Sequence, residues 1–248
     1  MKGVILAGGN GKRLAPLTVV TNKHLIPVYK KPMIFYPLET LVKAGIKEVL
    51  IVTSGEYIGH FYKLLGTGND WNIRIHYEIQ EGSGGTGAAL LCARDFIGSD
   101  DFIVVLGDNI IYENIGRFVN SFKEERDEFD AKILIAKVDD PKKYGVVEYD
   151  DKRITKLVEK PEVPFSNYVN TGLWIFKSEI FGLCEKLKKS VRNEYEITDI
   201  LSDYAQNGKL TYNILSSEWT DAGTFEQLYK ATVLMRKVEL AREENGEK

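Results

Sequence analysis

The sequence predicts an α/β fold of the Rossmann-like type, with a mostly parallel central sheet flanked by helices and a mixed or antiparallel section after it. Three features of the 248-residue chain predict this class. Short apolar runs alternate with amphipathic stretches through the first half, and a glycine-rich loop follows the first run. After about residue 130, strand-like runs follow one another with few helices between them. Alternating strands and helices favour a parallel sheet, because parallel neighbours need long crossover connections.

The strands expected in the first half are almost continuously apolar, which is typical of strands covered by helices on both faces. They are residues 3–7, 48–53, 73–79 and 102–106. Helices are expected between them at residues 32–44, 56–65 and 85–96. In the first of these helices, Ile34, Leu38 and Leu41 repeat at helical spacing and form one apolar face.

Strand-like runs dominate the next part of the chain. They are "AKILIAKV", "YGVVEYD", "KRITKLVEK" and "TGLWIF", and residues 149–153 predict a hairpin turn between the second and third runs. Helices are expected at 178–189 and 196–206. A last helix begins at Thr224, with Gln227 three residues later completing a capping box. Its buried stripe is expected to hold Leu228, Ala231, Met235 and Val238.

The composition excludes several classes of protein. The formal net charge is −3, and a protein that binds nucleic acid usually has a basic surplus, so no nucleic-acid partner is expected. No apolar run is long enough to span a membrane, and no secretion signal precedes the first strand. Cys92 and Cys184 are the two cysteines, far apart in apolar helical patterns, so we expect no disulfide framework and a cytoplasmic protein.

The loop after the first strand, "GVILAGGNGKRLAPLT", combines Gly8, Gly9 and Gly11 with Lys12 and Arg13. Backbone amides in such a loop bind anions well. It is neither a P-loop nor a dinucleotide-binding fingerprint, because both need glycines at positions that this loop lacks. A cationic phosphate-binding loop of another design is therefore predicted, with a plain turn carrying solvated charges as the alternative.

This loop and six later motifs resemble the signature of the sugar-1-phosphate nucleotidyltransferases, and among them most closely the short glucose-1-phosphate thymidylyltransferases. The resemblance runs from residue 1 to about residue 235. Its further motifs are "LGDNI", "VDDPKKYGVVE", "VEKPEVPFSNY", "NTGLWIF", "YEITDI" and "WTDAGT". The resemblance implies transfer of a nucleotidyl group from dTTP to glucose 1-phosphate, which gives dTDP-glucose and pyrophosphate in the first step of deoxysugar biosynthesis.

The resemblance also implies the organisation of the chain. Residues 1–248 are expected to form one domain, with a nucleotide-binding half at 1–130, a sugar-phosphate-binding half with closing helices at 131–235 and a frayed tail at 242–248. Members of the family are usually dimers or tetramers, so a homo-oligomer is expected. Longer members continue with further helices that build a regulatory site, and we expect this chain to lack that form of feedback control.

The residues that match the family's functional positions fall into four groups. The resemblance implies catalytic roles for Arg13, Lys23 and Lys160, nucleotide binding by Leu6, Gly8, Gly9, Gly11, Gln80 and Gly85, sugar binding by Gly107, Asn109, Gly145, Glu159, Asn170 and Thr171, and Mg²⁺ binding by Asp108 and Asp221. Taken alone, Asp108 would also fit a loop-capping role, and Glu159 with Lys160 would fit an exposed strand end. His24 is as compatible with a buried structural role as with a substrate contact, and Trp71 and Trp174 are expected to pack.

Two departures from the family pattern leave the substrates open. Ala88 stands where the nearest relatives carry a glutamine close to the base, so UTP is an alternative to dTTP. Asn170 stands where close relatives commonly carry an apolar residue. The resulting motif, "NTG", is similar to that of enzymes that use N-acetylglucosamine or mannose phosphates. A non-catalytic nucleotide-sugar-binding regulator is a further alternative, which the retained Arg13, Asp108 and Asp221 disfavour. Leu14 disfavours a Rossmann oxidoreductase.

Overall fold

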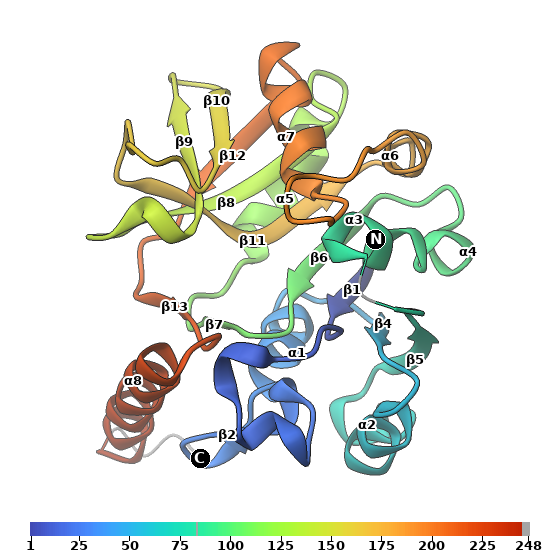
Figure 1. Cartoon of the computed structure of the whole chain (residues 1–248), viewed down its shortest axis with the longest axis vertical. Helices are drawn as coiled ribbons and strands as arrows, with labels where there is room; N and C mark the ends of the chain where they lie inside the picture. Colours follow the sequence, from blue (N-terminus) through green and yellow to red (C-terminus); the bar gives the residue numbers. More distant parts are fainter. Residues whose placement is uncertain (83, 245–248) are drawn as a thin grey trace.

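The computed structural model describes residues 1–82 and 84–244, and its first half contains the predicted parallel sheet (Figure 1). Four parallel strands lie in the order β6-β1-β4-β5. They are β1 (Lys2–Leu6), β4 (Glu48–Thr53), β5 (Arg74–Ile79) and β6 (Phe102–Leu106). Every residue of the runs 3–6, 49–53 and 102–105 is buried, which agrees with a sheet covered on both faces. The sequence prediction of these four strands is confirmed.

The second half extends the same sheet with antiparallel and mixed pairs, as predicted. Its strands are β8 (Ala131–Lys137), β9 (Gly145–Tyr149), β10 (Ile154–Glu159), β11 (Tyr168–Phe176) and β12 (Leu210–Ile214). Strand β11 runs antiparallel to β6 and joins the two halves, while β8 pairs with both β11 and β12. The predicted hairpin turn joins β9 to β10, with Asp150 N donating to Arg153 O at 3.0 Å.

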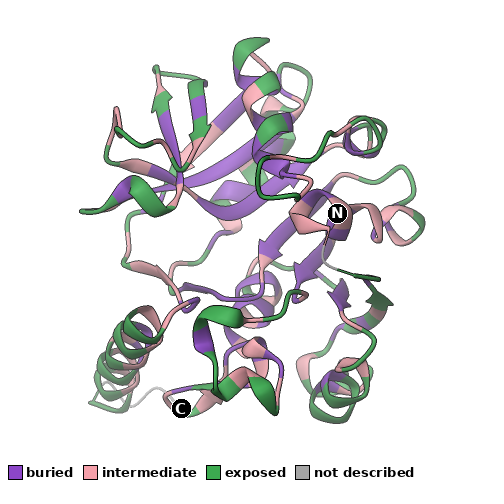
Figure 2. Cartoon of the chain, in the orientation of Figure 1, coloured by how far each residue is buried: buried purple, intermediate pink, exposed green. Residues whose placement is uncertain are grey.

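Helices cover both faces of the sheet. One face packs against α1 (Phe35–Lys43), α2 (Ile58–Leu65) and α5 (Gly116–Glu125), and the other against α3 (Gly85–Leu91), α4 (Arg94–Ile97), α6 (Ile180–Cys184) and α7 (Ile197–Gln206). Figure 2 shows the buried residues concentrated on the strands between these layers. The helix predicted at 85–96 is two short helices, and the one predicted at 178–189 ends at Cys184. Lys189 instead forms a β-bridge with Tyr195.

A third, smaller cluster lies beside the sheet and anchors the last helix. It joins β2 (Pro27–Val28), β3 (Lys31–Pro32), β7 (Asn109–Ile111), β13 (Trp219–Asp221) and α8 (Phe225–Glu244). In α8, Ala231 and Met235 are buried and Leu228 and Val238 pack against them, so the predicted stripe is confirmed. One half of the capping box is present, because Gln227 N donates to Thr224 Oγ1 at 3.3 Å, while Gln227 Oε1 accepts from the Thr224 hydroxyl at 2.8 Å.

The C-terminal end of α8 differs from the expected frayed tail. Residues 242–244 are helical, and residues 245–248 lie outside the described residues. Short 3-10 turns complete the fold at Lys12–Leu14, Leu17–Val19, Lys23–Leu25, Asn69–Trp71 and Pro141–Lys143. Among the described helices, none combines the length and the apolar composition needed to cross a bilayer.

Candidate functional site

A cavity of about 670 Å³ gathers the predicted site residues at the carboxyl ends of the parallel strands. Such strand ends are where ligands bind in open α/β sheets. The cavity is lined by Leu6, Gly8, Gly9, Gly11, Arg13, Lys23, Gln80, Gly85, Asp108, Asn109, Gly145, Glu159, Lys160, Asn170, Thr171 and Asp221. Gly107 is absent from this wall. A Cβ there would lie 2.7 Å from His24 Cδ2, so this glycine allows close packing of the His24 ring instead.

The glycine-rich loop leaves β1 and turns along one wall of the cavity. Gly9 and Gly11 have φ of 90° and 57°, conformations that glycine adopts without strain. Gly8 has another reason to lack a side chain, because a Cβ there would lie 2.6 Å from Gln80 Oε1. The loop continues into the 3-10 turn that carries Arg13. Backbone amides and a guanidinium therefore share one wall, a combination suited to phosphate.

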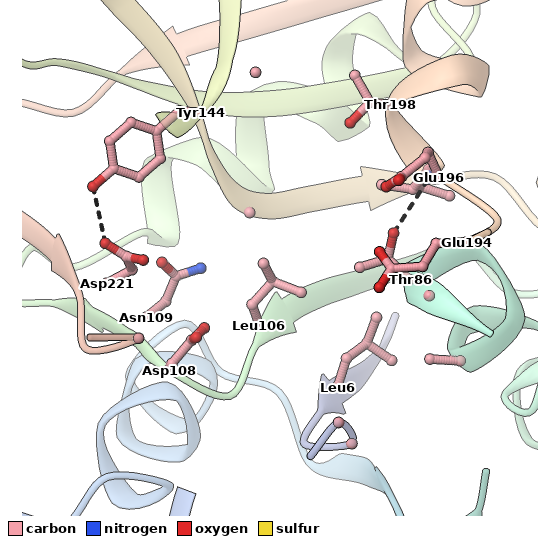
Figure 3. A pocket seen from close by; sticks show the side chains of 18 of the residues that line it. Leu6, Thr86, Leu106, Asp108, Asn109, Tyr144, Glu194, Glu196, Thr198 and Asp221 are labelled. Carbon is pink, nitrogen blue, oxygen red and sulfur yellow. Dashed lines mark hydrogen bonds between the residues drawn. The ribbon is translucent and has the colours of Figure 1, made fainter. Parts of the chain in front are cut away.

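The two predicted metal carboxylates, 113 positions apart in sequence, lie near each other on one side of the cavity (Figure 3). Asp108 follows β6, and Asp221 ends β13, whose pairing with β7 puts it opposite Asn109. Gly223 marks where these groups converge. A Cβ on Gly223 would lie 2.7 Å from Arg13 Nη2, 3.2 Å from Asp221 Oδ2 and 3.4 Å from Asp108 Oδ2.

The two carboxylates have opposite electrostatic surroundings. Burial alone would raise the pKa of Asp108, but the Lys23 ammonium, 2.6 Å from Oδ2, holds that pKa below its usual value. Burial, and next the charge of Asp108, raise the pKa of Asp221 to about 6. A cation between the two would remove this repulsion. His24 is completely buried nearby, and burial lowers its pKa to about 3, so it is neutral at physiological pH.

Asp221 is oriented by two hydrogen-bond donors that the sequence analysis did not include in the site. The hydroxyl of Tyr144 donates to Asp221 Oδ1 at 2.9 Å, and Gln227 Nε2 donates to the same oxygen. Gln227 Nε2 also donates to the Tyr144 hydroxyl at 2.8 Å. Both donors use Oδ1, which leaves Oδ2 facing Arg13. The capping-box signal identified Gln227 but carried no sign of this second role.

The oxygen ligands of the site fit a hard divalent cation whose coordination is completed by substrate. Within residues 1–82 and 84–244, no group of three or more His, Cys, Asp or Glu side chains could hold a metal alone. Two carboxylates are the protein ligands present. Mg²⁺ is typically held by one or two carboxylates together with phosphate oxygens and water. Asp108 and Asp221 are therefore the residues that would hold it.

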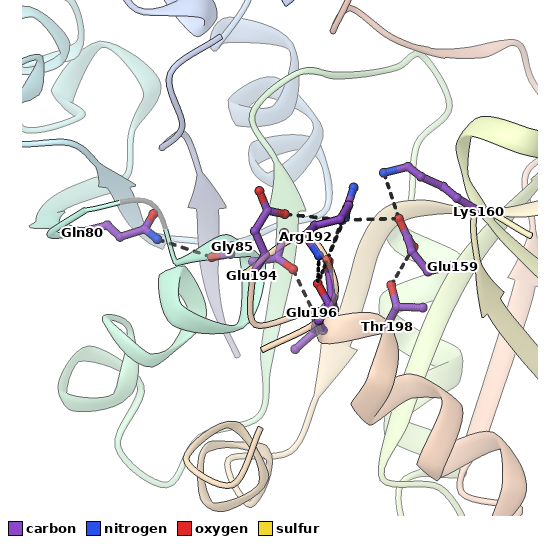
Figure 4. A network of polar contacts seen from close by, with 11 residues as sticks. Gln80, Gly85, Glu159, Lys160, Arg192, Glu194, Glu196 and Thr198 are labelled. Carbon is purple, nitrogen blue, oxygen red and sulfur yellow. Dashed lines mark hydrogen bonds and ion pairs between the residues drawn. The ribbon is translucent and has the colours of Figure 1, made fainter. Parts of the chain in front are cut away.

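The opposite wall carries a network around Glu159 at the end of β10 (Figure 4). Thr198 Oγ1 donates to Glu159 Oε2 at 2.9 Å, and Lys160 Nζ lies 3.1 Å from Oε1. Arg192 pairs with Glu196 at 2.7 Å and reaches Glu159 at 3.8 Å. Arg192, Glu196 and Thr198 were not among the predicted site residues, although "YEITDI" was part of the resemblance.

The floor between the two walls is a β-bulge in β11. The pairing of β11 with β8 shifts register between Asn170 and Trp174, and Gly172 within the shift has φ of 87°. Thr171 Oγ1 donates to Leu134 O at 2.8 Å, which fixes the strand at this point. Both Thr171 and its neighbour Asn170 line the cavity. Trp174, expected to pack, is 3% exposed but also lines the cavity. Bulges commonly re-aim side chains beside active sites.

The glycine-rich loop, several cations and a carboxylate pair line one cavity, an arrangement suited to a protein that handles phosphate-bearing anions. Comparison of the sequence with known families makes this class specific. The nucleotidyl transferase family profile matches residues 2–238, and the chain belongs to this family. Its substrates as a family are a nucleoside triphosphate and a sugar 1-phosphate, and its members commonly use a divalent metal.

The particular relatives are sugar nucleotidyltransferases. The chain is 39% identical to the glucose-1-phosphate thymidylyltransferase of Mycolicibacterium smegmatis, over 97% of this chain and 84% of that protein. A Bacillus anthracis structure described as a glucose-1-phosphate thymidylyltransferase, in complex with sucrose, is 42% identical, with a TM-score of 0.90 over 95% of both chains. A UDP-glucose pyrophosphorylase complexed with UDP-glucose is 25% identical, with a TM-score of 0.83 over 95% of this chain and 98% of the other.

Proposed function

We propose that this chain transfers a thymidylyl group from dTTP to glucose 1-phosphate, releasing pyrophosphate and forming dTDP-glucose, with Mg²⁺ held by Asp108 and Asp221. One observation carries the proposal, namely the convergence of Arg13, Asp108 and Asp221 on one point of the cavity. The names of the Mycolicibacterium and Bacillus relatives support this choice of substrates.

The reaction needs positioning more than proton transfer. A phosphate oxygen of glucose 1-phosphate attacks the α-phosphorus of dTTP in line, the bond to the bridging oxygen breaks, and its electron pair leaves with pyrophosphate. That nucleophile is ionised near neutral pH, since the second pKa of a phosphate monoester is about 6. No general base is required. The protein must instead bring two repelling anions together and stabilise the charge of the leaving group.

The chain's own cations have distinct parts in this proposal. Arg13 and Lys23 bind the triphosphate, with Arg13 at the leaving pyrophosphate because its planar guanidinium suits phosphate oxygens. Lys160 and Arg192, on the facing wall, bind the sugar phosphate. When bound, Mg²⁺ would neutralise charge on the triphosphate and on the departing group.

The proposal also divides the chain by substrate. Residues 1–130 form the nucleotide-binding half, since the glycine loop, Gln80 and Gly85 precede residue 130. Gln80 presents an amide that suits the edge of a pyrimidine. Residues 131–235 form the sugar-phosphate-binding half, with Glu159 accepting from sugar hydroxyls. The lining residues of the cavity support this division.

The test is release of pyrophosphate over a grid of dTTP and UTP against the 1-phosphates of glucose, N-acetylglucosamine and mannose, with Mg²⁺. We expect the highest kcat/KM for dTTP with glucose 1-phosphate. A preference for UTP, as in the UDP-glucose pyrophosphorylase, would change the triphosphate and keep the reaction. Asp108→Asn is the control and should lower turnover by roughly 10²–10³. No pyrophosphate from any pair would favour a nucleotide-sugar-binding regulator.

A further inference from the structure

We propose that Trp174 and Trp219 are positioning residues for the sugar, because each indole binds the amide oxygen of an asparagine that lines the cavity and so leaves its NH₂ group as the free donor. The sugar must then present acceptor oxygens to Asn170 and Asn109. This inference rests on the proposed function, since it assigns the recognition chemistry of the same sugar site.

The orientation of Asn170 follows from its two neighbours. Trp174 Nε1 lies 2.7 Å from Asn170 Oδ1, and the backbone N of Gly172 lies 3.2 Å from the same oxygen. An indole N–H and a backbone N–H are donors only, so the amide must turn its oxygen to both of them. Its NH₂ group points the other way. In the described part of the chain, no hydrogen bond uses the Asn170 NH₂ group, and Asn170 lines the cavity.

Asn109 repeats this arrangement on a different strand. Trp219 Nε1 donates to Asn109 Oδ1 at 2.8 Å, which again commits the oxygen. Asn109 is 1% exposed, and its Nδ2 is a buried side-chain nitrogen without a hydrogen-bond partner among the residues described. Figure 3 shows this residue beside the two aspartates on the cavity wall. A buried donor without a partner is costly, and a ligand that accepts from it recovers that cost.

The two amides flank the bulge at Gly172. A Cβ on Gly172 would lie 3.0 Å from Asn109 Nδ2, and the backbone N of the same glycine binds Asn170. On the facing wall, the Glu159 carboxylate is an acceptor only, beside the cations Lys160 and Arg192. The asparagine NH₂ groups therefore accommodate a sugar position that bears a hydroxyl or an acylated amine, because both offer an acceptor oxygen. A protonated amine there, which only donates, is rejected.

The decisive experiment is a pair of double-mutant cycles. Trp174→Phe and Trp219→Phe keep an aromatic ring and remove the N–H donor together with part of the indole, a loss of volume that Trp71→Phe shares. Each is combined with alanine at its own asparagine, Asn170→Ala or Asn109→Ala, and kcat/KM for glucose 1-phosphate is measured at saturating dTTP. Each tryptophan change should lower this value roughly three- to tenfold, leave the KM for dTTP unchanged, and have no further effect once its asparagine is alanine.

The chain supplies a matched control in Trp71, which packs edge-on against Phe35 at 5.0 Å and does not line the cavity. Trp71→Phe should leave the sugar kinetics unchanged. An unchanged kcat/KM in both Trp174→Phe and Trp219→Phe would overturn the inference, as would additive losses within each cycle. Failure of wild-type protein to release pyrophosphate from any sugar phosphate would instead overturn the proposed function.

A second measurement needs no variant and covers the case in which a substitution disturbs folding. The indole N–H groups of Trp174 and Trp219 should exchange with deuterium at least tenfold more slowly than that of Trp71, because both are hydrogen-bonded to an amide oxygen. Exchange of either group as fast as that of Trp71 would show that its amide is not locked.

Discussion

At the scale of single residues, Gly223 shows how an absent side chain shapes the site. It follows Asp221 in "TDAG", and its backbone has no positive φ that would demand glycine. What excludes a side chain is space, because a Cβ would lie 2.7 Å from Arg13 Nη2. The position therefore keeps the carboxylates and the guanidinium close to one another.

Gly223→Ala should accordingly damage activity more than stability. The methyl group would push Arg13 or a carboxylate aside, and displacements of about 1 Å can cost on the order of 10²-fold in rate. We expect such a fall in kcat/KM with a melting temperature close to wild type. Gly59→Ala in α2 is the matched control, since its Cβ meets no atom within 4 Å and alanine favours a helix. A melting temperature that falls with activity would contradict this account.

The unequal carboxylates predict how pH affects metal binding. With the pKa of Asp221 raised to about 6, the folded metal-free protein holds a proton that the unfolded chain has lost. The stability from this proton is complete below about pH 4 and disappears as pH rises through 6. The lowered pKa of Asp108 acts in the opposite direction, but only below about pH 4.

Mg²⁺ must therefore displace a proton from Asp221 at low pH. We expect its apparent affinity to fall by up to about tenfold from pH 6 to pH 5 and to change little above pH 7. The measurement is the rise in melting temperature on adding Mg²⁺, at constant ionic strength across that range. Asp221→Asn should abolish the pH dependence. An equal rise at pH 5 and pH 7.5 in the wild type would remove Asp221 from the metal site.

Most of the residues that the sequence predicts for the site line the cavity, but their hydrogen-bond partners were not predicted. Asp108 and Asp221 were recognisable because each stands in a short motif with a fixed place in the family. Tyr144, Arg192 and Gln227 were missed because their contacts in the cavity depend on how separate elements meet. The contact of Gln227 with Asp221, for example, depends on how α8 leaves β13. Hydrogen bonds of this kind follow from tertiary packing, which local spacing does not encode.

At the scale of secondary structure, the first turn of α8 does two things. Thr224 Oγ1 donates to Gln227 Oε1 at 2.8 Å, which directs the Nε2 end of that amide toward Asp221 and Tyr144. The first turn of this helix thus also orients Asp221, the proposed metal ligand. The helix packs mainly against β13 and β2, outside the main sheet. Helix α8 therefore contacts the predicted site through Gln227 in its first turn.

Gln227→Met should weaken metal binding while leaving α8 folded. Methionine matches glutamine in length and removes the Nε2 hydrogen bonds to Asp221 Oδ1 and to the Tyr144 hydroxyl, so Asp221 keeps only the Tyr144 donor and is held less firmly. We expect the Mg²⁺ concentration for half-maximal activity and the Kd for Mn²⁺, followed by electron paramagnetic resonance, to rise three- to tenfold. Gln206→Met, at an exposed position of α7, is the control. Unchanged Mn²⁺ binding would leave Gln227 as a cap alone.

Sequence patterns predicted best the strands that are buried along nearly their whole length. β4 and β6 have the predicted bounds, because an apolar run between polar ends is an unambiguous signal for a buried strand. β7 and β13, three residues each, were missed because so short a strand has no period of its own. Their pairing brings Asp221 to Asn109. The two strands that sequence patterns did not predict, β7 and β13, are thus the ones that bring Asp221 to the cavity.

At the scale of the whole molecule, the cavity lies where the parallel and antiparallel parts of one sheet meet. β11 pairs with β6 from the first part and with β8 and β9 from the second, and its bulge forms the floor. This shared strand connects the two walls and so sets their separation. In the proposed reaction, this separation sets how closely the sugar phosphate approaches the triphosphate.

If the two walls bind different substrates, changes on each should separate kinetically. Gln80→Ala removes the amide that lies between Gly8 and Gly85, so it should raise the KM for dTTP and loosen the choice of base. Arg192→Gln removes a cation from the facing wall, so it should raise the KM for glucose 1-phosphate about tenfold or more while that for dTTP stays constant. Both constants are measured with the other substrate saturating. A rise of both constants in either variant would mean that the walls do not act independently. Unchanged discrimination between dTTP and UTP in Gln80→Ala would remove this residue from the base site.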